Sequence, residues 1–198
     1  MWQDTVRWAS LWVMAAVTLA FLDAPFRTFG QRWVARRPHE RTLLLSMELN
    51  FIALWALFKF YLKWDRALAP AAVEPALTVV GALLVAAGAA LAVWGKLRLG
   101  RWFSATFGVK EGHELVTDGP FAITRHPIYS GLLLMLFGSA LAWDSLLTLL
   151  LALLLSMTLF FHTVYEELLF ERHFGDAYRE YRRRVPRLVP FIHPGGAT

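Results

Sequence analysis

Two segments in the second half of the chain carry side chains that can bind an anion or transfer a proton. Residues 113–129 read HELVTDGPFAITRHPIY and include Arg125 and His126, and residues 162–167 read HTVYEE. Imidazole and carboxylate groups serve as general acids and bases, and an arginine guanidinium binds a carboxylate through two parallel hydrogen bonds. These residue types, gathered in two short segments, indicate a binding or catalytic site.

The two segments are predicted to meet at one end of a helical hairpin. Residues 118–120 form a turn signal, and Pro127 suits the first turn of a helix, where its missing N–H group costs nothing. The residues before Pro127 then lie at a helix start, where free backbone N–H groups attract anions. Glu166 follows His162 by four residues, so both side chains share one helix face. The expected cluster contains Arg125, His126, Tyr129, His162, Glu166 and Glu167.

Each member of this cluster also has a simpler interpretation. Arg125 could bind a lipid phosphate, His126 could cap a helix, and Glu166 with Glu167 could form a solvated helix end. Because these side chains are all expected at one place, a shared binding or catalytic site is favoured over a separate explanation for each residue. No two histidines stand four residues apart, which is a common spacing of metal-binding helices, so no metal site is predicted.

The composition places the chain in a membrane and excludes several kinds of site. Of the 198 residues, 57% are hydrophobic and only 18% are charged, whereas soluble domains carry about 25% charged residues. The chain has no cysteine, which excludes disulfides, thiolate metal sites and a cysteine nucleophile. The net charge of +5 comes from basic residues scattered among apolar stretches. We therefore expect contacts with membrane lipids and none with nucleic acid.

Apolar stretches of about 20 residues predict membrane-spanning helices. The sequence predicts an all-α, polytopic membrane protein with about five spans. These are residues 8–26, 42–62, 73–97, 127–143 and 145–165. The small residues 86–90 let another helix approach closely, so the third span is predicted to pack centrally. Only Trp143-Asp144-Ser145 separate the last two spans, which predicts an antiparallel hairpin with Asp144 or Ser145 as the helix cap.

Basic residues predict the orientation of these spans. Five spans place 16 of the 20 lysines and arginines on one side, in residues 27–41, residues 96–125 and the tail after the fifth span. Loops rich in lysine and arginine stay in the cytoplasm. We therefore expect the N-terminus outside, and the C-terminus and the clustered side chains on the cytoplasmic side.

The clustered segments resemble the isoprenylcysteine carboxyl methyltransferase family and, more loosely, the membrane phospholipid methyltransferases. The resemblance rests on residues 113–129, Glu166-Glu167, residues 174–178 and the ending 186–192. It extends over residues 97–192 and does not include the first two spans.

By this resemblance the chain, residues 1–198, forms a single membrane methyltransferase domain. Residues 1–65 would hold two accessory spans, and residues 73–192 would form the catalytic core. Within the core, the cytoplasmic loop 96–127 and the C-terminal segment 166–192 would build the site around the base of the hairpin.

The same resemblance implies S-adenosylmethionine as the cofactor. Glu166 occupies the position of a cofactor-contacting glutamate, and Phe121 stands where the family commonly has tyrosine, so an aromatic ring is kept and a hydroxyl is lost. His162 stands where the eukaryotic prenylcysteine enzymes carry an arginine that helps to bind substrate. The predicted cofactor-binding residues are His113, Glu114, Leu115, Val116, Phe121, His126, Pro127, Ile128, Tyr129, Glu166 and Glu167.

The predicted reaction is methyl transfer to an amphipathic or lipidic acceptor, with a prenylcysteine-like carboxylate favoured. Glu166 is expected to face the positive charge of the cofactor, and Arg125 its carboxylate. A carboxylate acceptor needs no general base, whereas a phospholipid amine must lose a proton, with His162 as the natural base. Glu166, His162 and Arg125 are therefore the predicted catalytic residues, and no obligate protein partner is expected.

Two other functions are compatible with the sequence. Membrane sterol reductases, which use NADPH, have a distantly similar C-terminal layout, although the pair Glu166-Glu167 is typical of the methyltransferases. A non-enzymatic membrane scaffold would bind no nucleotide cofactor and would tolerate changes of Glu166.

Overall fold

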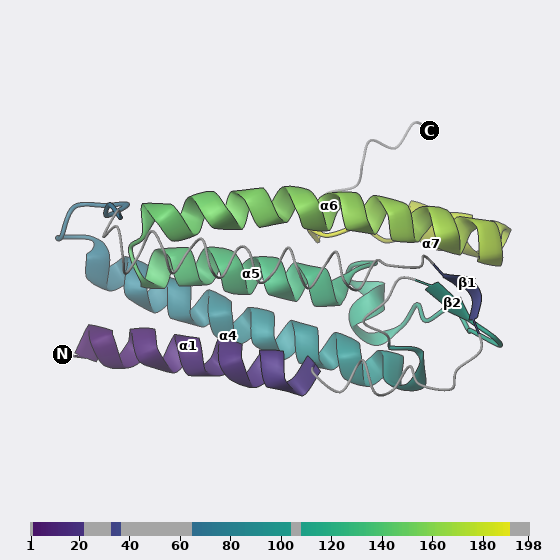
Figure 1. Ribbon diagram of the computed structural model, residues 1–198, viewed down its shortest axis with the longest axis horizontal. Coiled ribbons are helices and arrows are strands. Elements are labelled where there is room, and N and C mark those ends of the chain that lie inside the picture. The colour runs from purple at the N-terminus through teal and green to yellow at the C-terminus, as the bar shows by residue number, and fades with distance from the viewer. Residues whose placement is uncertain (1, 22–32, 37–64, 104–107, 191–198) are drawn as a thin grey trace.

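The computed structural model describes residues 2–21, 33–36, 65–103 and 108–190. Four long helices lie side by side along one axis (Figure 1). They are α1 (Trp2–Phe21), α4 (Glu74–Leu99), α5 (Pro127–Ala142) and α6 (Leu146–Phe174). A short fifth helix, α7 (Asp176–Arg184), lies against the last turns of α6 (Figure 1). The helical fold that the sequence predicts is confirmed for these residues, and the expected span 42–62 lies outside the described residues.

Glycines set the distance between α4 and α5. Gly81 and Gly88 on α4 face Gly138 and Gly131 on α5, and a Cβ atom added to Gly88 would lie 2.5 Å from the carbonyl oxygen of Gly131. Such contacts let the two helix backbones touch without intervening side chains. The predicted central packing of the third span is confirmed, although only Gly88 and Ala89 of the small residues 86–90 are buried.

The hairpin of α5 and α6 forms as the sequence predicts, and Ser145 is its cap. The Ser145 hydroxyl accepts a hydrogen bond from the backbone N–H of Thr148 at 3.1 Å, which satisfies one of the free donors at a helix start. The helix that carries the last predicted span, residues 145–165, continues beyond that span to Phe174. Gly175 then ends the helix at a positive φ of 57°, a conformation that favours glycine. Glu166 and Glu167 therefore lie within a continuous helix and not at its end.

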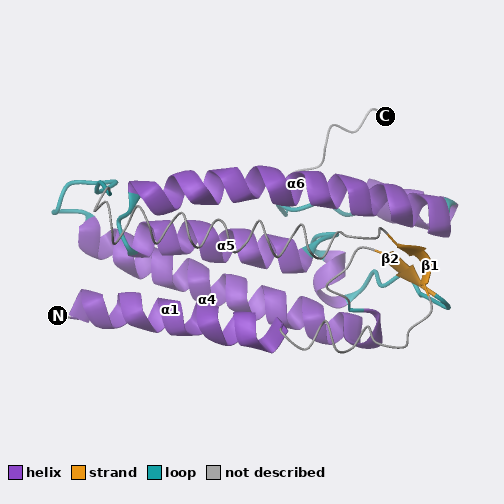
Figure 2. Ribbon diagram, viewed as in Figure 1, coloured by secondary structure: helices purple, strands orange, loops and turns teal. Residues whose placement is uncertain are grey.

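A small antiparallel sheet, which the all-α prediction did not include, lies beside the site end of the bundle (Figure 2). It pairs β1 (Trp33–Arg36) with β2 (Gly108–Lys110). Strands of three and four residues are too short to show an alternating hydrophobic pattern. The buried Lys110 ammonium donates to the carbonyl oxygens of Arg101 at 2.7 Å and Phe103 at 2.9 Å. These bonds fix the start of the loop that follows β2.

The outer surfaces of the helices are apolar. Two helical stretches, Glu74–Trp102 and Leu146–Phe174, are long and apolar enough to cross a membrane, and α5 is apolar but shorter. Only 33% and 17% of the residues in the most apolar parts of these stretches are buried inside the protein. Large side chains such as Leu83, Met157 and Phe161 point outward, as lipid-facing residues do. The chain is accordingly an all-helical integral membrane protein in its described part, apart from the small sheet.

Candidate active site

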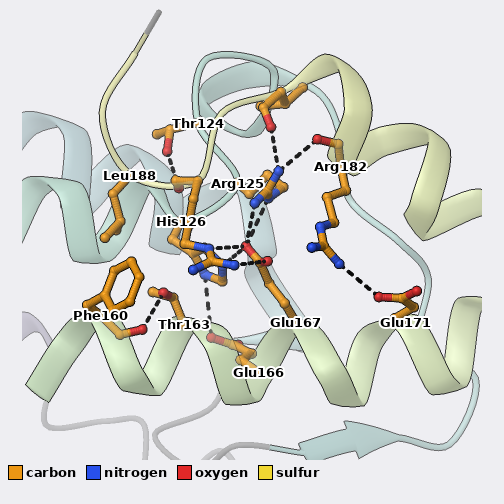
Figure 3. A network of polar contacts seen from close by, with 12 residues as sticks. Thr124, Arg125, His126, Phe160, Thr163, Glu166, Glu167, Glu171, Arg182 and Leu188 are labelled. Atoms are coloured by element: carbon orange, nitrogen blue, oxygen red, sulfur yellow. Dashed lines mark hydrogen bonds and ion pairs between the residues drawn. The ribbon is translucent and has the colours of Figure 1, made fainter. Parts of the chain in front are cut away.

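Glu167 is the centre of a buried ionic network at the base of the hairpin (Figure 3). Its Oε1 atom accepts from Nε of Arg125 at 2.9 Å and from Nε of Arg187 at 3.0 Å, and it lies 3.1 Å from Nε2 of His126. Its Oε2 atom accepts from Nη2 of Arg187 at 2.8 Å. The side chains of Arg125 and Glu167 are 1% and 3% exposed. Charges this deeply buried need such partners, because an unpaired buried charge is strongly destabilising.

Arg125 joins this network to the C-terminal part of the chain. Its Nη1 atom donates to the carbonyl oxygens of Arg182 and Val185, both at 2.8 Å, and its backbone N–H donates to the carbonyl of Pro186 at 2.9 Å. Figure 3 shows its guanidinium between Glu167 and the carbonyl of Arg182. The guanidinium therefore holds three elements together: the loop before α5, helix α6 and the end of α7.

His126 lies between the two neighbouring carboxylates of α6. Its Nδ1 atom is 3.6 Å from Oε2 of Glu166, and its Nε2 atom is 3.1 Å from Oε1 of Glu167. Burial alone would lower the pKa of His126, but the interactions of its ring with the acceptor carboxylates of Glu166 and Glu167 outweigh burial, so its pKa lies above the ordinary value. Tyr129 stacks on the His126 ring at a centroid distance of 5.7 Å. Arg125, His126, Tyr129, Glu166 and Glu167, which were expected to cluster, do meet here. His162 lies on α6 one turn before Glu166.

A small, mainly apolar pocket opens beside this network, between the loop after β2 and helices α6 and α7. Six of its lining residues were singled out from the sequence: His113, Glu114, Leu115, Val116, Phe121 and Arg125. The remaining five were not among the predicted cofactor-binding or catalytic residues: Leu99, Phe170, Phe174, Tyr178 and Tyr181. Of these, Phe174 and Tyr178 belong to the segment 174–178 on which the family resemblance rests. Phe170 and Phe174 follow Glu166 at helical spacing, which is the sequence signal that would have found them.

Aromatic rings form one wall of this pocket. The His113 ring stands edge-on to Phe170 and Phe174, with centroid distances of 5.9 and 5.7 Å, and Phe170 stands edge-on to Tyr178 at 5.8 Å. On its other side His113 stacks on Trp102 at 4.9 Å. A wall of this kind suits a flat aromatic ligand group.

Two buried polar atoms of the pocket have neither a hydrogen bond nor an ion pair among the described residues: Nδ1 of His113 and the hydroxyl of Tyr178. A third buried atom, Nη2 of Arg125, has no hydrogen bond there but lies 2.8 Å from Oε1 of Glu167. Burial, followed by the charges of Lys110 and His173, lowers the pKa of His113 to about 4, so its ring is neutral at neutral pH. Burial also raises the pKa of Tyr178, so its hydroxyl stays protonated. Buried polar groups are normally paired. These two groups fit a ligand that carries hydrogen-bonding nitrogen atoms or hydroxyls beside a flat ring, as an adenosine group does.

A second, more polar and more open hollow adjoins the pocket. The two share Leu99, Glu114, Leu115 and Val116. The second hollow adds Arg98, Arg101, Trp102, Thr117 and Asp118. Ion pairs cross it, from Arg98 to Asp118 at 2.5 Å and from Arg101 to Glu114 at 3.5 Å. Both signs of charge are therefore available next to an aromatic pocket.

The other residues singled out from the sequence do not line either hollow. Pro127 is buried, and Ile128 packs against Gly95 of α4. Tyr129, His162 and Glu166 are half-buried near the ionic network, and His126 and Glu167 lie inside it. Within the ranges that the structure describes, no group of three or more histidine, aspartate or glutamate side chains could hold a metal ion.

Comparison with known proteins identifies the family. Residues 76–177, about half of the chain, match the family described as phospholipid methyltransferase. The chain belongs to this family. The match begins on α4 and ends at the start of α7, so it includes the hairpin, Arg125, His126 and Glu167, and most of the pocket, but not Tyr178, Tyr181 or Arg187.

Relatives of this family member carry one recurring name. Protein-S-isoprenylcysteine O-methyltransferase B of Arabidopsis thaliana is 31% identical over 116 residues, which are 57% of this chain and 59% of that protein. Protein-S-isoprenylcysteine O-methyltransferase of Schizosaccharomyces pombe is 36% identical over 81 residues, which are 40% of this chain and 34% of that protein. The aligned region thus spans about a third to three-fifths of these relatives. The resemblance predicted from the sequence is confirmed.

One solved structure shares the fold. It is described as the eukaryotic intramembrane Ras methyltransferase ICMT (isoprenylcysteine carboxyl methyltransferase). The two structures align with a TM-score of 0.63 over 96% of this chain and 68% of that chain, at 21% sequence identity. At this identity the alignment establishes a common fold.

Proposed function

We propose that this family member is an S-adenosylmethionine-dependent methyltransferase that methylates the carboxylate of a prenylcysteine-like acceptor. The observation that carries the proposal is the aromatic pocket with two unpartnered buried polar atoms, most of whose lining lies in the residues that match the family. The names of the relatives in Arabidopsis and Schizosaccharomyces support the choice of acceptor.

The two adjoining hollows match the two ends of S-adenosylmethionine. The aromatic pocket would hold the adenosine end, with His113 and Tyr178 supplying hydrogen bonds. Arg98 and Arg101 would bind the carboxylate of the amino-acid end, and Glu114 its ammonium group. In this arrangement Arg125 supports the pocket instead of binding the cofactor's carboxylate, because its Nε and Nη1 atoms already donate to Glu167 and two carbonyl oxygens, and its Nη2 atom lies 2.8 Å from the same carboxylate.

S-adenosylmethionine supplies a reactive methyl group on a sulfonium ion. The protein then has to place an acceptor in line and to exclude water. Glu166 is half-buried at the edge of the network, and we assign it the role of facing the sulfonium charge. A carboxylate acceptor is ionised at neutral pH and requires no proton transfer. His162, one turn before Glu166 on α6, would lie on the acceptor side of Glu166.

The proposed site is cytoplasmic. It lies at the end of the bundle where α7 carries arginine at positions 182, 183 and 184, and the counts of basic residues predict that this side faces the cytoplasm. The apolar outer faces of α4 and α6 are consistent with an acceptor whose hydrocarbon chain enters from the bilayer. We also retain the domain organisation predicted from the sequence, with residues 1–65 as accessory to a core in residues 73–192.

A phospholipid amine is the second candidate acceptor, because the matching family is described as phospholipid methyltransferase. The two acceptors give different products. A carboxyl methyl ester releases methanol in alkali, whereas an N-methyl amine is stable there. Methyl transfer to an amine would also require a base, for which His162 is the candidate.

The proposal is tested by equilibrium binding of S-adenosylmethionine to the detergent-purified protein, with NADPH measured beside it. Binding of S-adenosylmethionine alone is expected, followed by alkali-labile methylation of farnesylcysteine analogues. Alkali-stable methylation of phosphatidylethanolamine would replace the carboxylate acceptor with the amine. Binding of NADPH alone would indicate a reductase, and binding of neither cofactor would indicate a scaffold.

A further inference from the structure

The segment that follows α7, residues 185–188, crosses the base of the hairpin and is bound there along its length. The backbone N–H of His126 donates to the carbonyl of Arg187 at 3.2 Å. The hydroxyl of Thr124 donates to the same carbonyl at 2.6 Å. The hydroxyl of Ser130 donates to the carbonyl of Leu188, also at 2.6 Å. We call residues 185–188 the C-terminal strap.

Side chains add an ionic tie between the strap and α6. The Arg187 guanidinium binds both carboxylate oxygens of Glu167, at 3.0 and 2.8 Å, and it lies 5.2 Å from the centroid of the Phe160 ring. Arg125 binds the same carboxylate and two carbonyl oxygens, those of Arg182 and Val185. Through Arg125 and Arg187, Glu167 therefore links the start and the middle of the strap to α6, and both of its carboxylate oxygens take part.

The strap continues directly into the wall of the pocket. Val185 packs with Tyr178 and Tyr181 in one buried cluster, against which Phe170 and Phe174 also pack. The Tyr181 hydroxyl donates to the carbonyl oxygen of Phe121 at 2.7 Å. Any displacement of the strap therefore moves the two tyrosines that close the pocket on the side of α7.

We infer that Glu167 is a positioning residue, which fixes the strap and α7 so that Tyr178 and Tyr181 complete the cofactor pocket. It acts through Arg125 and Arg187 and does not itself contact the cofactor. The inference rests on the proposed function, because it assigns the pocket to S-adenosylmethionine. It changes the role of Glu167 from the cofactor-binding one that the sequence suggested to a supporting one.

The test compares Glu167→Gln with Glu171→Gln. Glu171 lies one turn farther along α6 and also binds α7, through Arg182 at 3.0 Å, but its side chain is 28% exposed. In Glu167→Gln, the Kd and KM for S-adenosylmethionine are expected to rise about tenfold or more, the size found when supporting partners of a binding site are removed. The kcat at saturating cofactor is expected to change less than about threefold, because binding is lost and not transition-state stabilisation. Glu171→Gln is expected to behave like the parent.

Two results would overturn the inference. Unchanged cofactor affinity in Glu167→Gln would show that the tie does not shape the pocket. A loss of kcat with unchanged cofactor affinity would place Glu167 at the reacting atoms. If Glu167→Gln does not fold, Arg187→Met takes its place, because the Arg187 side chain is 21% exposed and its loss leaves Arg125 paired with Glu167. The same rise in Kd is then expected, and an unchanged Kd would overturn the inference equally.

Hydrogen exchange gives a readout that needs no cofactor. Backbone amides of residues 178–188 are expected to exchange faster in Glu167→Gln than in Glu171→Gln, and equal exchange would contradict the inference. A failure of the proposed function is distinguishable, since the parent protein itself would then bind no S-adenosylmethionine. If the parent binds and Glu167→Gln binds equally well, only the positioning role fails.

Discussion

The hydroxyl of Tyr178 offers a test in which stability and cofactor binding should change in opposite directions. This hydroxyl is buried in the pocket wall and has no hydrogen-bond partner among the described residues. Leaving a buried polar group unpaired costs about 1–3 kcal/mol. Tyr178→Phe removes this cost from the cofactor-free protein, which should become more stable by up to about that amount.

The same substitution should weaken the binding of S-adenosylmethionine. If the cofactor completes the missing hydrogen bond, its loss costs about 0.5–1.5 kcal/mol, which corresponds to a rise in Kd of about two- to twelvefold. Isothermal titration in detergent measures the Kd, and thermal unfolding with and without cofactor measures stability. The variant is expected to unfold at a higher temperature without cofactor and to gain less from its addition.

Tyr181 is the matched control, because it lies three residues away on the same pocket wall and its hydroxyl is paired. It donates to the carbonyl oxygen of Phe121 at 2.7 Å. Tyr181→Phe is therefore expected to destabilise the cofactor-free protein by about 0.5–1.5 kcal/mol. The reasoning is refuted if Tyr178→Phe also destabilises the cofactor-free protein and leaves the Kd unchanged, because its hydroxyl would then have a structural partner.

Four further predictions concern the helix contact, the cofactor pocket and the acceptor. Gly88→Leu is expected to lower the unfolding temperature in detergent, since overpacking costs about 1–3 kcal/mol or more, whereas Leu at the exposed Ala87 should leave it unchanged. The pKa of His113 is lowered to about 4, so its ring should stay neutral between pH 8 and 6. NMR titration should place its protonation near pH 4. The affinity for the cofactor should fall only as the pH approaches that value. A midpoint near the ordinary 6.5 would contradict this. Glu166→Gln should lower kcat/KM roughly ten- to hundredfold, because it removes the negative charge that faces the sulfonium, an interaction of about 1.4–2.8 kcal/mol, and near-normal turnover would remove Glu166 from the site. His162→Ala should spare methylation of a farnesylcysteine carboxylate and abolish methylation of an amine, and equal losses on both acceptors would exclude a role as base.

The sequence by itself determined the helices and the position of the site along the chain. Apolar stretches and short connections are local properties, so they predicted α4, α5 and α6, with Asp144 or Ser145 as the cap of the hairpin. The two polar segments stood out because lipid-facing helices otherwise lack such side chains. Local patterns did not predict the end of α6 at Phe174 or the short strands β1 and β2, because these segments carry no strong periodic signal.

Only the tertiary structure decided which of the clustered side chains face a ligand. Sequence spacing made Glu166 and Glu167 equal candidates, but they point from different faces of α6, and Glu167 is taken by Arg125, His126 and Arg187. Those partners lie 20 to 42 residues away, so no local pattern encodes their choice. The aromatic wall of the pocket likewise depends on α7 folding back at Gly175. Helices follow from local patterns of residues, whereas the partner of a buried charge follows from which loops and helix ends the folded chain brings within hydrogen-bonding distance.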